Sequence, residues 1–112
     1  MLRQQQRITK KKDFDRIFAQ GKSRYTDILG VKLVSNGLTF NRFGLIISTK
    51  VSKLAVERNR VRRQIKAALA QLDDQIVASD LLVLTLPKIK LASYKEISDN
   101  LHFCLKSLRA LK

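Results

Sequence analysis

The 112-residue sequence has little of several residue types that whole classes of protein require. It has one cysteine, Cys104, which excludes an internal disulfide and a zinc site built from cysteines. Its single proline, four glycines and 45% hydrophobic residues exclude a wholly disordered chain. It has no apolar run of about 18 residues, and its basic start lacks the apolar region of a secretory signal. These absences predict a cytoplasmic protein with no membrane-spanning segment.

Acidic residues are scarce as well. Nine Asp and Glu stand against 23 Lys and Arg, which gives a net charge of +14. A compact domain with this charge repels itself, and such a charge favours a polyanionic partner. Residues 1–66 carry +13 and residues 67–112 carry +1. We therefore expect an anion-binding face built mainly from residues 1–66.

Side-chain combinations typical of enzymes are also missing. The sequence has one histidine, His102, and it has no phosphate-binding loop, no HExxH zinc motif and no GxSxG nucleophile motif. Asp73, Asp74 and Asp80 are conceivable metal ligands, but a helix end and a loop explain them more simply. From its residues alone we interpret the chain as a binding protein, with His102 on a helix surface and Cys104 in the core.

The hydrophobic pattern predicts alternating helices and strands. The expected elements are a helix over residues 10–20, strands over 28–34 and 43–48, a helix over 52–72, a strand over 81–86 and a last helix opened by a Ser93–Glu96 capping box. We expect Thr9 to cap the first helix and Gly21 to end it. Residues 1–8 are polar and basic without periodicity, which predicts a flexible arm. The alternation is typical of an α/β or α+β domain, in which helices pack on a small sheet.

The helix over residues 52–72 carries the strongest functional signal. Its predicted apolar stripe consists of Leu54, Val61, Ile65, Ala68 and Leu72. Its opposite and flanking positions are almost wholly cationic and consist of Arg58, Asn59, Arg60, Arg62, Arg63 and Lys66. A merely solvated face is the alternative, but such a face usually mixes both signs, because like charges four residues apart weaken a helix. Arginine binds phosphate with two nitrogens, so the pattern predicts a nucleic-acid-binding helix without distinguishing DNA from RNA.

Phe14 and Phe18 lie one turn apart on the first helix, and two roles stay open for them. An isolated pair of aromatic rings most often packs in a core. The pair can also form a stacking platform for unpaired bases, with Tyr25 as a further candidate. Both roles are compatible if one ring lies in the core and the other at its rim.

Several motifs, in order along the chain, resemble the bacterial ribonuclease P protein subunit. Residues 43–50, FGLIISTK, and 55–66, AVERNRVRRQIK, resemble the family's strand and the helix with the R-N-R motif that follows it. Residues 13–21 resemble its D-F-x-x-V-F-x-x-G motif, and residues 80–84 resemble its late D-[IV]-[IV] strand. Thr49 departs from the family pattern, because it replaces the first of two lysines. The resemblance spans nearly the whole chain.

The resemblance implies a fold and a function. The implied fold is a single α/β (α+β) two-layer sandwich over residues 1–112, with the order α-β-β-β-α-β-α and a left-handed strand–helix–strand crossover, against the general right-handed rule. The implied function is that of the protein subunit of ribonuclease P, a ribonucleoprotein endonuclease that hydrolyses precursor tRNA to remove its 5′ leader. In that family the RNA performs the chemistry and its phosphates hold most of the Mg²⁺, so we expect the protein alone to be inactive.

The resemblance also assigns residues to partners. The catalytic RNA would contact Arg58, Asn59, Arg60, Arg62, Arg63 and Lys66. The single-stranded leader would lie in a cleft lined by Phe14, Phe18, Ser48 and Lys50. No residue would be catalytic and none would bind a metal strongly, and we expect a monomer outside the holoenzyme. Two rival functions are a structural RNA-binding protein, such as a ribosomal one, and an independent metal-dependent nuclease.

Overall fold

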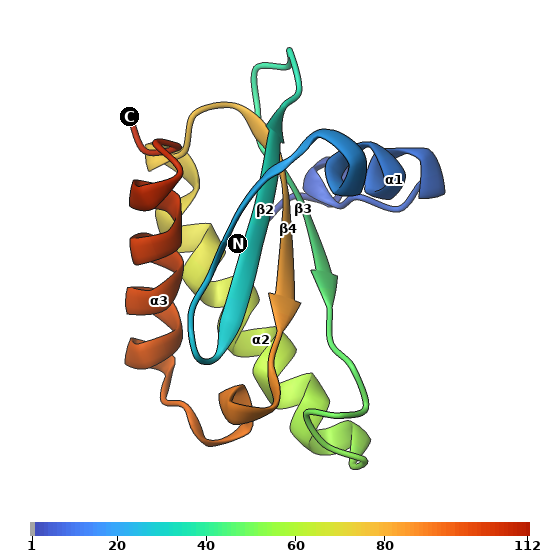
Figure 1. Ribbon diagram of the computed structural model, residues 1–112, viewed down its shortest axis with the longest axis vertical. Coiled ribbons are helices and arrows are strands. Elements are labelled where there is room, and N and C mark those ends of the chain that lie inside the picture. Colours follow the sequence, from blue (N-terminus) through green and yellow to red (C-terminus); the bar gives the residue numbers. More distant parts are fainter. Residues whose placement is uncertain (1) are drawn as a thin grey trace.

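The computed structural model describes residues 2–112 as three α-helices arranged around one mixed sheet (Figure 1). The elements in chain order are η1 (Gln4–Gln6), α1 (Lys11–Gln20), β1 (Lys22–Tyr25), β2 (Leu29–Ser35), β3 (Arg42–Ile46), α2 (Ala55–Leu72), η2 (Asp73–Gln75), β4 (Ser79–Thr85), η3 (Pro87–Leu91) and α3 (Tyr94–Ser107). The α/β (α+β) class and the order α-β-β-β-α-β-α are confirmed. In this described part of the chain, no helix has both the length and the apolar character needed to cross a membrane.

The four strands lie in the order β1-β2-β4-β3. Strand β2 pairs antiparallel with both β1 and β4, whereas β3 pairs parallel with β4. Helix α2 connects the two parallel strands, as a parallel pair requires; the left hand of this crossover stays a prediction. The hydrophobic pattern does not predict β1, because all of its residues are exposed on an edge strand.

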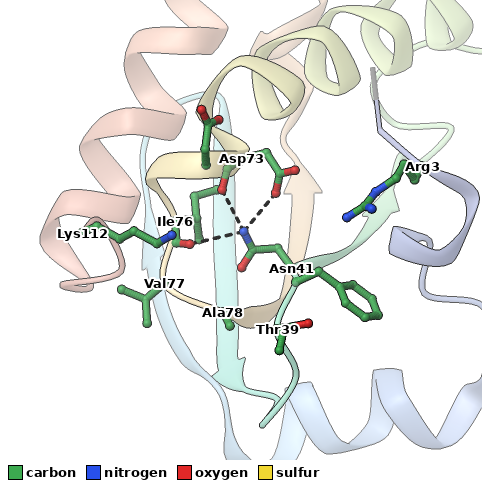
Figure 2. Close-up of a pocket in the computed structure, with 10 residues that line it drawn as sticks. Arg3, Thr39, Asn41, Asp73, Ile76, Val77, Ala78 and Lys112 are labelled. Carbon is green, nitrogen blue, oxygen red and sulfur yellow. Dashed lines mark hydrogen bonds between the residues drawn. The ribbon is translucent and has the colours of Figure 1, made fainter.

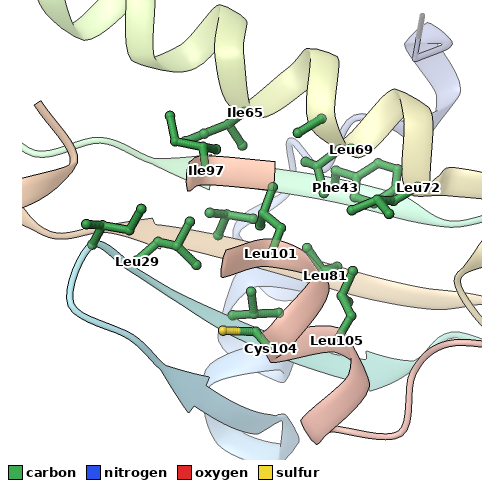
Figure 3. Packing of buried hydrophobic residues seen from close by; sticks show 14 of the residues in the cluster. Leu29, Phe43, Ile65, Leu69, Leu72, Leu81, Ile97, Leu101, Cys104 and Leu105 are labelled. Carbon is green, nitrogen blue, oxygen red and sulfur yellow. The ribbon is translucent and has the colours of Figure 1, made fainter. Parts of the chain in front are cut away.

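The larger hydrophobic cluster lies between one face of the sheet and helices α2 and α3 (Figure 3). Strand β4 shows how the two faces divide, because successive side chains of a strand point to opposite sides. Leu81 and Val83 belong to this cluster, whereas Leu82 belongs to a smaller cluster on the other face. The main core is therefore closed by two helices on one side of the sheet.

Helix α2 fits the predicted apolar stripe with one exception. Its buried residues are Val61, Ile65, Ala68, Leu69 and Leu72. Leu54, predicted on the same stripe, is 61% exposed. That prediction is wrong because Leu54 is the N-cap residue in an extended conformation, so the helical period does not reach it.

Helix α3 begins with the predicted capping box. The Glu96 N–H donates to the Ser93 hydroxyl and the Ser93 N–H donates to the Glu96 carboxylate, each over 3.1 Å. The buried residues of the helix are Ile97, Leu101, Cys104 and Leu105. This arrangement confirms the predicted start of the helix.

Helix α1 lies on the opposite side of the sheet from α2 and α3 (Figure 1). Its one fully buried side chain, Ile17, packs with Ile8 and Leu82 in the smaller cluster. Phe14, Val34 and Leu84 are partly buried against that cluster. The helix therefore adds a short layer to the two-layer sandwich and covers only part of the second sheet face.

The segment before α1 differs from the flexible arm predicted over residues 1–8. The Ile8 N–H donates to the Phe43 carbonyl oxygen over 2.9 Å, and the Ile8 side chain is buried. The side chain of Gln6 is also buried, and its amide donates to the Asp73 carboxylate over 2.9 Å. The described part of the segment is thus held along the free edge of β3.

The two ends of α1 are made differently from the prediction. Lys10, not Thr9, is the N-cap residue, and its side chain makes no capping hydrogen bond. Gly21 ends the helix as predicted, but with an ordinary φ of −72°. A Cβ atom at Gly21 would stand 2.4 Å from the Ile17 carbonyl oxygen. Glycine is therefore required because the backbone of Ile17 passes too close for any side chain.

Candidate nucleic-acid interface

Most of the predicted cationic residues of α2 lie away from its buried stripe, whereas Arg58 and Arg62 border that stripe. This cationic face consists of exposed Asn59, Arg60, Arg63 and Lys66 together with half-buried Arg58 and Arg62. Arg58 Nη1 donates to the Ser52 carbonyl oxygen over 2.8 Å, and Arg60 Nη2 donates to the Lys90 carbonyl oxygen over 2.6 Å. Two of the arginines are therefore oriented by backbone carbonyl groups.

The single carboxylate of α2, that of Glu57, has its close partners outside the cationic face, although the charge of Arg60 also acts on it. It accepts a 2.6 Å hydrogen bond from the Ser52 hydroxyl and lies 3.5 Å from Lys90 Nζ. The bond from Ser52, followed by the charge of Lys90, lowers the pKa of Glu57 below its ordinary value. Among the ion pairs formed by residues 2–112, none joins a carboxylate to the cationic face. The face therefore keeps its charge available for an external anion.

A second candidate surface is the part of the sheet that α1 leaves uncovered. Tyr25, Gly30, Leu84 and Ile46 pair in register across β1, β2, β4 and β3, so they lie on one face; we call them the open sheet face. Tyr25 is 46% exposed and Ile46 is 36% exposed. The Tyr25 ring lies on Gly30, where a Cβ atom would stand 2.3 Å from the ring. The open sheet face is therefore partly exposed and partly aromatic.

The two phenylalanines of α1 stand beside this surface in different environments. Phe14 is half-buried against Leu82 and Gly44, and a Cβ atom at Gly44 would stand 2.9 Å from the Phe14 ring. Phe18 is 47% exposed, with Lys32 Nζ 5.8 Å from its ring centroid. The environments of the two rings therefore differ. Phe14 packs at the edge of the smaller cluster, as a core residue would, whereas Phe18 is accessible to a stacking partner.

Ser48 and Lys50 lie in the turn that follows β3. The Lys50 N–H donates to the Ser48 hydroxyl over 2.8 Å, and the Lys50 side chain is exposed. These two residues lie two and four positions after Ile46 of the open sheet face, so a hydroxyl and a positive charge follow the end of β3 in the chain. The predicted leader-binding residues therefore adjoin a single face of the sheet from two elements.

Sequence reasoning missed an ionic network beneath α1. Asp80, at the start of β4, is fully buried and accepts hydrogen bonds from Arg42 Nε (2.8 Å), Arg42 Nη2 (2.5 Å) and Asn36 Nδ2 (3.1 Å). Arg16 of α1 also forms an ion pair with the Asp80 carboxylate, and Asp13 of α1 lies 3.4 Å from Arg42. The interpretation of Asp80 as a loop residue is wrong, because the strand begins at Ser79.

The charges around Asp80 determine its protonation. Burial alone would raise the pKa of this carboxyl group, but the hydrogen bonds from Arg42 and Asn36 and the charges of Arg42 and Arg16 outweigh burial and lower the pKa below its ordinary value. The hydrogen bond and the charge of Asp80 in turn raise the pKa of Arg42. The network is therefore ionised at neutral pH. In the sequence, the network is indicated only by Asp80 itself, which directly precedes the apolar run of a strand. A carboxylate that is buried there needs a charged or hydrogen-bonding partner.

A hollow of about 300 Å³ near the chain's C-terminal end holds polar groups that satisfy one another (Figure 2). The buried Asn41 amide donates to the Asp73 carbonyl oxygen (2.9 Å), the Asp73 carboxylate (3.0 Å) and the Ile76 carbonyl oxygen (3.3 Å). Its own oxygen accepts the Ser79 N–H over 2.9 Å. This arrangement braces the loop between α2 and β4.

The single histidine and the single cysteine belong to neither candidate surface. His102 is exposed, as predicted, and lines a hollow of about 410 Å³ with Lys106 and Arg109. Cys104 is buried, as predicted, and burial raises the pKa of its thiol. Across residues 2–112, no three His, Cys, Asp or Glu side chains gather as a metal site would require.

Comparisons with known proteins agree with this description. The family model for ribonuclease P matches residues 2–109. The chain is 34% identical to a "Ribonuclease P protein component" from Pseudanabaena sp. (strain PCC 6903), over 99% of this chain and 97% of that protein. A solved Staphylococcus aureus RNase P protein is similar with a TM-score of 0.87 and 28% identity, over 96% of this chain and 98% of that one. A second S. aureus structure, described as a mutant with defective mRNA degradation activity, gives a TM-score of 0.88 and 28% identity, over 96% of this chain and 91% of that one.

Proposed function

Because the chain belongs to the ribonuclease P protein family, and so is a component of that ribonuclease, we propose that it binds two RNAs on two different surfaces. The cationic face of α2 binds the catalytic RNA of the enzyme. The open sheet face, with the phenylalanines of α1, binds the single-stranded 5′ leader of precursor tRNA. The observation that carries the proposal is the cationic face, with which no carboxylate of residues 2–112 forms an ion pair.

The chemistry of the cationic face suits a folded RNA. Arginine presents a planar fork that matches phosphate, and the side chains of Arg62, Arg63 and Lys66 lie along the same side of one helix. Like charges at this spacing weaken the helix on their own, so phosphates would relieve a repulsion that the free protein carries. Asn59 adds a donor and an acceptor for sugar or base edges.

The open sheet face suits a single strand. Unpaired bases stack on exposed aromatic rings without regard to sequence, and Phe18 and Tyr25 supply such rings. Lys32 beside Phe18 and Lys50 after β3 supply positive charge for the backbone of the strand.

We assign the hydrolysis step to the RNA subunit. The residues of both surfaces are cationic, aromatic or aliphatic, and residues 2–112 hold no cluster of carboxylates and histidines for a metal. They therefore do not fit Mg²⁺ as a tightly held protein cofactor, and we propose that RNA phosphates hold the Mg²⁺ of the holoenzyme. The role of the protein is to place the leader relative to the catalytic RNA.

One specific observation favours a second candidate function. A mutant of a similar S. aureus RNase P protein is described as having defective mRNA degradation activity. The alternative is that this chain cleaves RNA by itself. Protein freed of RNA by nuclease treatment should leave both precursor tRNA and an mRNA intact if the main proposal holds. Metal-dependent cleavage of either substrate by the purified protein would instead support the alternative.

The test of the main proposal is a rescue assay. Bacterial ribonuclease P RNA would be incubated with precursor tRNA at a low Mg²⁺ concentration, with and without the protein. We expect the protein to restore cleavage at the mature 5′ end, and to help substrates with a long leader more than those with one leader nucleotide. A structural RNA-binding protein would bind RNA without restoring cleavage, and that result would overturn the proposal.

A further inference from the structure

We propose that Asp80 is a positioning residue for the leader. Through Arg16 and Arg42 it fixes helix α1 on the second face of the sheet, and so determines where Phe14 and Phe18 stand beside the open sheet face. The inference rests on the proposed leader-binding function and adds to it the residues that orient the aromatic rings.

Apolar packing alone gives α1 little directional restraint. The helix has 10 residues, and only Ile17 among them is fully buried. Its cluster on this face contains just two other buried residues, Ile8 and Leu82, among the described residues. Hydrophobic contact is not directional, so a contact of this size would allow the helix to slide or rotate.

The ionic network supplies the missing direction. Arg16 pairs with Asp80 of β4, and its Nη1 also donates to the Ser35 carbonyl oxygen of β2 over 3.3 Å. Asp13, nearly one turn earlier on α1, lies 3.4 Å from Arg42 of β3. Two positions on the helix are thus tied to three strands of the sheet. Arg42 contacts both oxygens of Asp80, so the acceptor itself is held in one orientation.

The network lies two residues along the strands from the aromatic contacts. Asp80 and Arg42 are paired in register, and the next pair on the same face is Leu82 and Gly44, on which Phe14 packs. The pair after that belongs to the open sheet face. A shift of α1 by one helical turn, about 5.4 Å, would move Phe14 off Gly44 and carry Phe18 away from the uncovered surface.

The experiment compares charge removal inside and outside the network. Arg16→Gln removes the cation that α1 places on Asp80 and leaves the buried Asp80–Arg42 pair intact. Lys11→Gln is the matched control, because it removes one charge from the same helix at an exposed pair with Asp15. Each protein is assembled with ribonuclease P RNA, and the affinity is measured for substrates with a long leader and with one leader nucleotide. Thermal melts report folding.

Arg16→Gln should reduce the affinity advantage of the long leader by about fivefold or more, the equivalent of one lost base stack. Affinity for the short-leader substrate and assembly with the RNA should stay unchanged, as should the long-leader advantage of Lys11→Gln. Arg16→Gln should add little further loss to Phe18→Ala, because Phe18 is the more exposed of the two rings that the network positions. If Arg16→Gln does not fold, Asp13→Asn takes its place, because it leaves Asp80 paired with both arginines. Asp13→Asn should reduce the affinity advantage of the long leader in the same selective way, but by less.

Two kinds of result separate the possible failures. If the unaltered protein gives no advantage to a long leader, the proposed leader-binding function fails. If that advantage exists and folded Arg16→Gln and Asp13→Asn proteins retain it, the positioning role is overturned. It is also overturned if Arg16→Gln flattens the salt dependence of long-leader binding by about 0.7, because that slope change would mean that Arg16 contacts a leader phosphate directly.

Discussion

The two faces of the sheet are built in opposite ways. One face is closed by α2 and α3 over a continuous aliphatic cluster. The other carries a single short helix, a small cluster and a buried ionic network, and leaves Tyr25 and Ile46 exposed. The closed face provides the bulk of the apolar burial, which dominates folding stability. The second face can therefore remain partly uncovered, and its polar network orients groups for binding.

The largest effect should come from removing the centre of the ionic network. Asp80→Ala leaves Arg42 and Arg16 without their buried partner, and losing one member of such a pair costs about 3–5 kcal/mol of unfolding free energy. Urea denaturation followed by circular dichroism measures this. A loss below about 1 kcal/mol would mean that the second face does not depend on the network.

The same network makes stability depend on acid pH. The pKa of Asp80 is lowered in the folded protein, so its ionisation stabilises the fold above about pH 4, the ordinary pKa of Asp. That contribution is lost as the pH falls through the lowered pKa. Asp80→Asn should remove this part of the pH dependence, as measured by urea midpoints between neutral and acid pH. If the urea midpoints of the unaltered protein and of Asp80→Asn changed with pH in the same way, Asp80 would not be the source of this pH dependence.

A core substitution on the closed face should affect stability without selective effects on RNA. Leu101 is fully buried between α3 and the sheet, and Leu→Ala at such a site costs about 2–5 kcal/mol of unfolding free energy. Below its melting temperature, the Leu101→Ala protein should keep its preference for long leaders. Loss of that preference in the folded variant would show that the two faces are not independent.

The phenylalanines of α1 should differ from each other. Phe18→Ala removes an exposed ring and should weaken long-leader binding by about 1–3 kcal/mol with little change in thermal stability. Phe14→Ala removes a ring packed on Leu82 and Gly44, so it should lower the melting temperature as well. Binding titrations with long and short leaders, paired with melts, check this. Equal effects of Phe18→Ala on both substrates would remove Phe18 from the leader site.

The smallest effect on folding should come from the cationic face. Replacing Arg62 and Arg63 together by Gln should change stability by about 0.2–0.5 kcal/mol per like-charge pair, in the stabilising direction. Assembly with the catalytic RNA should weaken, and the log–log salt slope should flatten by about 0.7–0.9 for each lost phosphate contact. An unchanged slope would mean that this face is merely solvated.

The features predicted correctly from the sequence are those that depend on local periodicity. The stripe of Val61, Ile65 and Leu72 and the capping box at Ser93 follow from residues within a few positions of one another. Leu54 was assigned wrongly because its extended backbone interrupts that period. Strand β1 has no buried residue, so its pairing with β2 leaves no hydrophobic pattern.

The part of the site that sequence could not predict depends on contacts between distant segments. The partners of Asp80 lie 38 and 64 residues away, at Arg42 and Arg16, and no local pattern specifies their meeting. The difference between Phe14 and Phe18 likewise arises only when α1 packs on the sheet. The residues of the cationic face could be grouped from the sequence because all of them lie on one helix, and their contact with RNA stays a prediction.

The most direct test of the two-surface account is a crossed binding experiment with Phe18→Ala and the Arg62→Gln/Arg63→Gln protein. Each is measured for its affinity for the catalytic RNA and, once assembled, for its preference for a long leader over one leader nucleotide. The account predicts that Phe18→Ala loses the leader preference and keeps RNA affinity, whereas the double variant loses RNA affinity and keeps the preference. Loss of both properties in both folded proteins would contradict it.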